Sequence, residues 1–471
     1  MSSSILSRGA TLTSPNQVEG AGQALNKVRQ RPKKLTDPNR LLKKGIWVFF
    51  ILLIFEGALR KWVLPGLSTP LLVIRDPLAI WLVFMAIRRN IFSLNIYMVA
   101  MGVIAMVSIF TAVFLGHGNL IVAMYGARIL LIYFPCMFVI GRVFNREDII
   151  KMGKWTLIIS LFMTVLLTLQ FYSPQSALVN RGVGGSMEGA GFEAGAFGFY
   201  RPPGTFTFTT GTTLFYGFAA VFIFYFWFYF KHVSRILLTL ATISLVISIP
   251  LSISRALFFQ VIVSLVFAII FALRKPQYLR KMTLALIGSI IAIALLGHVS
   301  FFETAAETFT ARFEHAGDVE GGLKGTLGNR FLGGMILAFA NTTEQPFFGH
   351  GLGMGTPVGS MLLTGKVSFL IAEEEWSRLI GELGLLMGLG VILVRVMLSL
   401  KLAFLSYKRL RLGDLLPWIL MSFGFLTLTT GGWWQPTYLG FSTLIGGLII
   451  ASLKPLPRAH PKMHTNKQVT K

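Results

Sequence analysis

The segment GIWVFFILLIFEGALRKWVL, residues 45–64, is the first of a series of long apolar runs. A helix rises about 1.5 Å per residue, so about 20 apolar residues cross the hydrocarbon core of a bilayer. Runs of about this length recur at 45–64, 67–87, 94–115, 120–141, 154–172, 206–230, 235–251, 256–273, 281–299, 376–400, 415–431 and 436–453. The pattern predicts an all-α polytopic membrane protein with about twelve transmembrane helices.

The composition excludes an ordinary soluble domain. Hydrophobic residues make up 54% of the 471 residues and charged residues only 13%, with a mean hydropathy of +0.69. Soluble domains average about 25% charged residues. Because the apolar stretches are long and continuous rather than alternating, they predict membrane helices and not the strands of a barrel.

The net charge of +24 has two possible partners, a nucleic acid or a membrane surface. With the N-terminus inside, every predicted cytoplasmic loop carries Lys or Arg, whereas the outer connections near 117 and 432 carry neither. Positive charge on cytoplasmic loops orients membrane helices and attracts anionic lipids. We therefore predict that both termini are cytoplasmic, that anionic membrane lipids are partners, and that no nucleic acid is bound.

The ends of the chain differ from the apolar region between them. Residues 1–44 contain Ser, Gly, Lys and Arg with little apolar periodicity, which predicts a disordered basic cytoplasmic tail. We predict a membrane domain over 45–455 and a second cytoplasmic tail over 456–471. The single cysteine, Cys136, lies in an apolar run, so one chain offers neither a disulfide framework nor a thiolate metal site.

Two predicted extracytoplasmic loops are much longer than the others. The loop 173–205 is rich in glycine, and the loop 300–375 holds nine of the nineteen acidic residues. Within the second loop, residues 329–341 have the apolar spacing of a helix. Long loops of this kind are usually functional or disordered, and the helical spacing favours function. The outer face is therefore the predicted working surface.

Several charges fall inside the predicted spans. Glu56, Asp76 and Arg128 each lie roughly 12–14 Å from the outer end of their span. Arg75 and Arg60 are close to them in sequence. Buried charges of opposite sign are usually paired, so these residues form either a structural ion-pair cluster joining three helices or part of a catalytic site. The absence of a loop motif beside them favours the ion-pair cluster.

Three arginines stand near the outer ends of predicted spans, in segments rich in Gly, Ser and Pro. They are Arg201 in YRPPGTFTF, Arg255 in LSISRALFF and Arg330 in LGNRFLGG. A guanidinium group stays charged and binds phosphate oxygens in pairs, so arginines that converge on the outer face suit a diphosphate at the lipid surface. Each arginine alone would instead be interpreted as an interfacial residue that extends toward water.

These segments carry a resemblance to a known family. S-x-S-R opening a helix, R-x-x-G-T-F before another, P-F-F-G-H-G-L-G in the long loop and E-x-G-x-x-x-G after it resemble the O-antigen ligase and O-antigen polymerase family, over roughly 170–400. The resemblance implies a GT-C-like membrane glycosyltransferase with one long extracytoplasmic loop, in the bacterial inner membrane, that works without metal or cofactor. Such a protein transfers or polymerises glycan from an undecaprenyl diphosphate-linked donor to an acceptor glycan or glycolipid of lipopolysaccharide or exopolysaccharide.

The resemblance also implies residue roles. Arg255 and Arg330 match the family's diphosphate-binding arginines best, Arg201 matches them less closely, and Arg312 in ARFEH is a further candidate. The ligases usually carry a histidine, the expected base for the acceptor hydroxyl, shortly before the E-x-G helix. This chain has AEEEW at 372–376 instead.

The glutamates at this position are the candidates for the missing base. At 100° per residue, Glu375, Arg378 and Glu382 fall within about 60° of one another on a helix. We predict that they line a cleft as catalytic residues, with Glu375 as the general base and Glu382 positioning Arg378. Glu373 and Glu374 are interpreted as an exposed acidic loop end, and His350 is an alternative base.

Other functions remain open. A secondary transporter or lipid-linked glycan flippase would also have about twelve spans, but no internal repeat links the two halves and the charges lie toward the outer side. A non-catalytic sensor or assembly protein is a third alternative. His298, Glu303, Glu307 and His315 could gather a metal ion, yet their spacing matches no zinc motif, so we expect no metal.

Overall fold

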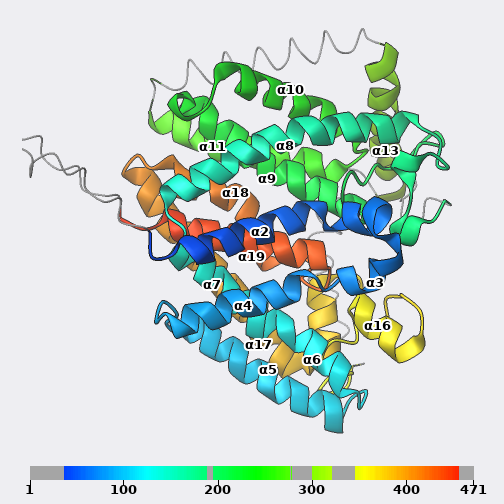
Figure 1. Cartoon of the computed structure of the whole chain (residues 1–471), viewed down its shortest axis with the longest axis vertical. Helices are drawn as coiled ribbons and strands as arrows, with labels where there is room; N and C mark the ends of the chain where they lie inside the picture. The colour runs from blue at the N-terminus through cyan, green and yellow to red at the C-terminus, as the bar shows by residue number, and fades with distance from the viewer. Residues whose placement is uncertain (1–36, 188–194, 276, 278–299, 321–344, 456–471) are drawn as a thin grey trace, which may run out of the picture. The chain divides into compact units, whose positions relative to one another are not determined.

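The computed structural model describes residues 37–187, 195–275, 277, 300–320 and 345–455 (Figure 1). These residues form helices, turns and loops, and none of them belongs to a β-strand. The helices are α2 (Arg40–Ala58), α3 (Ser68–Leu71), α4 (Arg75–Arg88), α5 (Ile96–Phe114), α6 (Leu120–Arg128), α7 (Phe134–Val143), α8 (Arg146–Tyr172), α9 (Thr209–Phe228), α10 (Arg235–Leu251), α11 (Arg255–Arg274), α13 (Ser300–Glu320), α16 (Pro357–Thr364), α17 (Glu375–Arg411), α18 (Leu415–Thr429) and α19 (Pro436–Ser452). The predicted all-α class is confirmed for the described residues.

Seven helices among the described residues are long and apolar enough to cross a membrane. They cover Pro65–Arg88, Ile96–Phe114, Leu120–Val143, Arg146–Tyr172, Thr209–Phe228, Arg255–Arg274 and Glu375–Arg411. The first of these joins α3 and α4, and the third joins α6 and α7. Three shorter apolar helices, α10, α18 and α19, have 17, 15 and 17 residues. The chain therefore has the character of a membrane protein, as its composition predicts.

The count of twelve spans and the GT-C-like fold stay predictions. The run 281–299 lies outside the described residues, as do most of the tails predicted over 1–44 and 456–471. The helix α2 begins at Arg40, inside the segment predicted as a tail. This helix is not among the seven candidate spans. It carries charged residues near both ends, Lys43 and Lys44 at the start and Glu56 near the end.

The helices α9 and α19 lie at the centre of the described bundle. Most residues of both helices are buried, so their sequences are apolar on all sides rather than along one stripe. The helix α19 packs against α7 and α18 and also contacts α8 and α9. In Figure 1, α19 lies between the group α8–α11 and the helices α4–α7.

The helix α17 consists of two helical segments that meet at Gly384, where the backbone has φ 74° and ψ 172°. Beyond this glycine the chain folds back. The close approach of Gly388 to the first segment shows this: a Cβ added to Gly388 would lie only 2.8 Å from Cα of Ile380. In an uninterrupted helix these two residues would be about 12 Å apart. The run 376–400, predicted as one continuous span, is therefore a short helix followed by a longer one packed against it.

The charges predicted to pair within the spans do so. Arg75 Nε lies 2.7 Å from Glu56 Oε2, and Arg128 Nη1 lies 2.5 Å from Asp76 Oδ1. Arg60 Nη1 lies 3.8 Å from Glu56 Oε1. Because these contacts join α2, α4 and α6, the predicted ion-pair cluster between three helices is confirmed.

The two long outer segments contain further helical structure. The segment predicted as the loop 300–375 begins with α13, and α16 follows later. In the segment 173–205, two 3₁₀ turns cover Leu178–Asn180 and Val183–Gly185. The helix-like stretch 329–341 and Arg330 within it lie outside the described residues. Both segments lead directly to residues that line the cavity described next.

Candidate functional site

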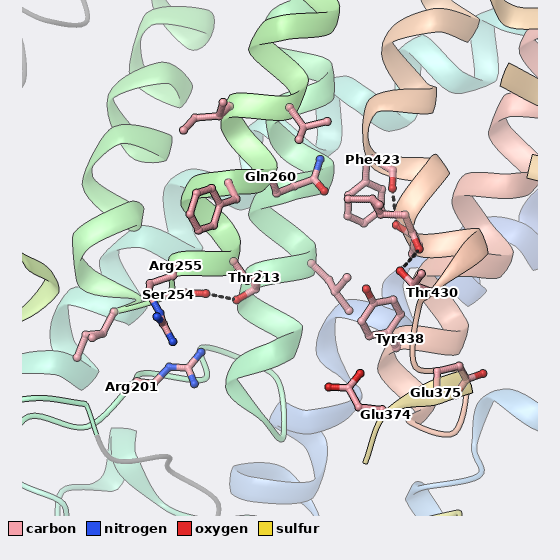
Figure 2. Close-up of a pocket in the computed structure, with 18 of the residues that line it drawn as sticks. Arg201, Thr213, Ser254, Arg255, Gln260, Glu374, Glu375, Phe423, Thr430 and Tyr438 are labelled. Atoms are coloured by element: carbon pink, nitrogen blue, oxygen red, sulfur yellow. Dashed lines mark hydrogen bonds between the residues drawn. The ribbon is translucent and has the colours of Figure 1, made fainter. Parts of the chain in front are cut away.

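A cavity of about 590 Å³ lies where α9, α11, α13, α17, α18 and α19 meet (Figure 2). Its wall combines apolar, polar and charged side chains. Those that carry charge or hydrogen-bonding groups are Arg201, Thr213, Ser254, Arg255, Gln260, Arg312, Glu374, Glu375, Trp376, Thr427, Thr430 and Tyr438. Ligand sites commonly have volumes of about 300–1,000 Å³ and a few convergent polar groups, so the cavity is the candidate site.

Three of the four arginines predicted to bind diphosphate line this cavity. Arg201 comes from the loop before α9, Arg255 from the first turn of α11, and Arg312 from α13. In Figure 2 the side chains of Arg201 and Arg255 point toward each other. Arg312 also donates a hydrogen bond from Nη1 to the carbonyl of Gly195, at 3.4 Å. Segments far apart in sequence therefore bring three positive charges to one cavity.

The position of Arg255 follows from a sharp turn between α10 and α11. Ile253 has φ 48°, a left-handed conformation that is unusual for a β-branched residue. Ser254 then caps α11 by accepting a hydrogen bond from the backbone N–H of Leu257, and its hydroxyl lies 2.9 Å from that of Thr213. This explains the S-x-S-R pattern: the serine begins the helix and the arginine follows at its first residue.

The segment that follows Arg201 is held by a lysine, Lys61, that the sequence analysis does not single out. The ammonium group of Lys61 donates to the carbonyls of Gly204 and Phe206, at 2.7 and 2.8 Å. Gln170 also donates to Gly204 and accepts from its N–H at 2.7 Å. Lys61 is only 1% exposed, so it is an internal support for the R-x-x-G-T-F segment. The sequence feature that could have identified Lys61 is its position as a charged residue within the first apolar run, 45–64.

The opposite wall of the cavity begins with the first residues of α17. Glu374, Glu375 and Trp376 line it, together with Thr430 and Tyr438. The indole Nε1 of Trp376 donates to the carbonyl of Thr429 at 3.1 Å, which holds the start of α17 against the end of α18. Carboxylates and arginines thus stand on different walls of one cavity (Figure 2).

The three residues predicted as catalytic belong to one buried ion-pair network. Arg378 Nε lies 3.1 Å from Glu375 Oε2, and Arg378 Nη1 lies 2.7 Å from Glu382 Oε2. Glu382 also accepts hydrogen bonds from the backbone N–H groups of Gly353 and Gly355. The shared helix face and the Arg378–Glu382 contact are as predicted, but only Glu375 of the three lines the cavity. Their catalytic roles stay predictions.

A fourth member of the network, Arg395, was not predicted. Its Nη1 donates to Glu375 Oε1 at 2.5 Å, and its Nε and Nη2 donate to the carbonyls of Leu428 and Gly431. Two arginines and two glutamates therefore balance in charge, which a buried network requires. An arginine inside the apolar run 376–400 indicates a buried charge that needs a partner. The sequence does not identify Glu375 as that partner, because the two residues meet only where α17 folds back.

The alternative base and the alternative metal site have weaker structural support. His350 Nε2 lies 3.1 Å from Gln345 Oε1, and His350 is not among the residues that line the cavity. Within the described ranges, no three His, Cys, Asp or Glu side chains are grouped so that they could hold a metal ion. His298, weighed as a metal ligand, lies outside those ranges.

Comparison with known proteins adds no identification. No family model, curated protein or solved structure matches this chain.

Proposed function

We propose that the chain is a membrane glycosyltransferase that transfers or polymerises glycan from an undecaprenyl diphosphate-linked donor to an acceptor glycan or glycolipid. It would act at the outer face of the bacterial inner membrane. The observation that carries the proposal is the convergence of Arg201, Arg255 and Arg312 on one cavity. All three are diphosphate-ligand candidates from the sequence motifs, and the fourth candidate, Arg330, lies outside the described residues.

The charge of the cavity supports an anionic group that leaves during the reaction. A diphosphate gains negative charge as its bond to the sugar breaks, and fixed guanidinium groups stabilise that charge. Water would do this less well, because its dipoles must reorient while the arginines are already held in place. The arginine wall therefore suits a leaving diphosphate better than a neutral transported sugar.

The apolar part of the cavity supports a lipid-linked donor. Phe259, Ile262 and Val263 of α11 line the cavity beside Arg255. The helix α11 is one of the apolar candidate spans, and its residue Ile262 is 38% exposed. A ligand with a charged head and a hydrocarbon tail would place its head at the arginines and its tail along this helix.

The test is reconstitution of the purified chain in proteoliposomes. Lipid-linked oligosaccharide extracted from cells that lack this chain serves as donor, and mass spectrometry measures new glycosidic bonds and released undecaprenyl diphosphate. We expect both products, and we expect their formation to persist in excess EDTA. Movement of the oligosaccharide between leaflets without a new bond would refute the proposal and support a flippase. Binding of undecaprenyl diphosphate with no product would refute it in favour of a sensor or assembly role.

A further inference from the structure

We propose that Gln260 and Tyr438 bind the uncharged hydrogen-bonding groups of the first donor sugar, the one joined to the diphosphate. This assignment rests on the proposed glycosyl transfer and adds which part of the donor the cavity recognises. Both residues line the cavity, Gln260 from α11 and Tyr438 from α19. In Figure 2 their side chains extend toward the same space, beside the pair formed by Arg201 and Arg255.

The side-chain amide of Gln260 is held in one orientation. Its Nε2 donates to the backbone carbonyl of Ser422 at 3.1 Å and to the hydroxyl of Ser264 at 3.4 Å. Because a carbonyl oxygen can only accept, the amide nitrogen must face Ser422. The side chain also packs closely on α9, since a Cβ added to Gly217 would lie 2.8 Å from Gln260 Cγ. The amide oxygen Oε1 accepts from none of the described residues, so it is a fixed acceptor for a ligand.

The hydroxyl of Tyr438 is the second available group. Its ring packs against the backbone after α18, where a Cβ added to Gly431 would lie 2.4 Å from Tyr438 Cε1. The residue is partly exposed, and its phenolic oxygen has no hydrogen-bond partner in the described part of the chain. A phenol can donate and accept one hydrogen bond each. The ring is thus held while its polar end is left for a ligand.

The threonines of the cavity are different. Thr213, Thr427 and Thr430 also line it, but each hydroxyl donates to the backbone carbonyl four residues earlier in the chain. Their protons are therefore already used. Among the described uncharged lining residues, Gln260 and Tyr438 are the two whose polar end atoms stay available as a fixed acceptor and a donor.

These two atoms suit a sugar better than the other parts of the donor. The hydrocarbon tail has no hydrogen-bonding group, and phosphate oxygens accept hydrogen bonds, so neither could donate to Gln260 Oε1. A sugar hydroxyl can donate to Gln260 and accept from Tyr438, and an N-acetyl amide can do the same through its N–H and C=O groups. The first sugar is bonded to the diphosphate, so it stays beside the arginines and reaches both side chains.

The experiment compares the binding of two ligands to the chain in nanodiscs. One is undecaprenyl diphosphate, which carries no sugar, and the other is the lipid-linked oligosaccharide extracted from cells that lack this chain. Tyr438→Phe removes one oxygen and no internal hydrogen bond. We expect it to weaken binding of the lipid-linked oligosaccharide about 2- to 10-fold, the usual effect of one neutral hydrogen bond, and to leave undecaprenyl diphosphate binding unchanged.

A second variant and a matched control accompany this change. Gln260→Met keeps a similar length and removes the acceptor, so we expect the same selective loss. It also removes the hydrogen bond to Ser422, and its unfolding temperature is therefore measured alongside. The control is Tyr229→Phe, because the Tyr229 hydroxyl donates to the carbonyl of Gly413 at 3.3 Å and Tyr229 is not among the lining residues. We expect this control to bind both ligands as the original chain does.

The outcomes separate the sugar subsite from the proposed function. Unchanged binding of the lipid-linked oligosaccharide by Tyr438→Phe, or an equal loss of both ligands, would overturn the assignment. If the original chain transfers glycan in proteoliposomes while both variants bind both ligands normally, only the sugar subsite is wrong. If the original chain forms no glycosidic bond, the proposed function itself fails.

Discussion

Arg395 and Glu375 form an ion pair at 2.5 Å although both belong to α17. In a straight helix they would lie about 30 Å apart, since each residue adds about 1.5 Å. The pair exists because Gly384 reverses the chain, so that an arginine of the second segment neutralises a carboxylate at the start of the first. The contact fixes the cavity wall that carries Glu374.

Gly384 is the residue on which this fold-back depends. Its φ of 74° and ψ of 172° are accessible almost only to glycine, and a Cβ there would lie 2.0 Å from the carbonyl oxygen of Phe347. We expect Gly384→Ala to lower the free energy of unfolding by at least about 1–3 kcal/mol, measured by thermal unfolding in detergent. The control is Gly102→Ala in α5, where an added Cβ would meet no atom outside its own stretch of helix within 4 Å and alanine favours the helix. Equal unfolding temperatures for the two variants would contradict this view.

The buried network should respond to charge balance. Arg395→Gln removes one of two positive charges and leaves two carboxylates with one guanidinium, so we expect a loss of about 3–5 kcal/mol in the free energy of unfolding. Adding Glu375→Gln restores neutrality and should recover part of that loss. A double-mutant cycle measures the coupling. Arg395→Lys should rescue poorly, because the guanidinium contacts Glu375, Leu428 and Gly431 together. Strict additivity of the two single changes would argue against a shared network.

The chemistry of individual residues, and not the topology of the helices, predicts the arginines that line the cavity. Arg201 and Arg255 were identifiable from their neighbours in sequence: Gly204, with φ 60°, marks a turn that follows Arg201, and Ser254 begins the helix at Arg255. The helices themselves follow from the long apolar runs. Local patterns were therefore sufficient to find the arginine wall.

The carboxylate wall could not be predicted in the same way. Hydropathy shows that residues 376–400 are apolar, but it gives the same signal for one long helix and for two that fold back at a glycine. The partner of Arg395 is therefore invisible in the sequence. For the same reason Glu374 was interpreted as an exposed loop end, since its place in the cavity depends on long-range packing.

Lys61 offers a test of how Arg201 is held. Lys61→Met keeps a similar length but leaves the carbonyls of Gly204 and Phe206 without this donor, so we expect a loss of about 2 kcal/mol in stability. We also expect weaker binding of undecaprenyl diphosphate in nanodiscs. The exposed Lys44→Met is the matched control and should change neither quantity.

A positioning role for Lys61 can be separated from a general loss of structure. If Lys61 acts through Arg201, then Lys61→Met should weaken binding strongly in the original chain and little in an Arg201→Ala background. Full additivity of the two changes would show that Lys61 does not position Arg201.

Arg255 has a close internal control in Arg235. Both are the first residue of a helix, and both follow a serine that caps it, Ser254 before α11 and Ser234 before α10. Arg255 lines the cavity, whereas Arg235 is exposed and is not among the lining residues. The two alanine variants therefore remove the same side chain from the same kind of helix start, and only one removes it from the proposed site.

We expect Arg255→Ala to lower the transfer rate about 100- to 1,000-fold, because the leaving diphosphate loses a fixed positive charge. Arg255→Lys should restore little, since a lysine lacks the two-pronged contact with phosphate oxygens. Arg235→Ala should leave both the rate and the binding of undecaprenyl diphosphate unchanged. Steady-state kinetics in proteoliposomes, at matched amounts of folded protein, provide the measurement. Equal loss in the two alanine variants would mean that arginine supports the helix start, and that the cavity does not bind the diphosphate through Arg255.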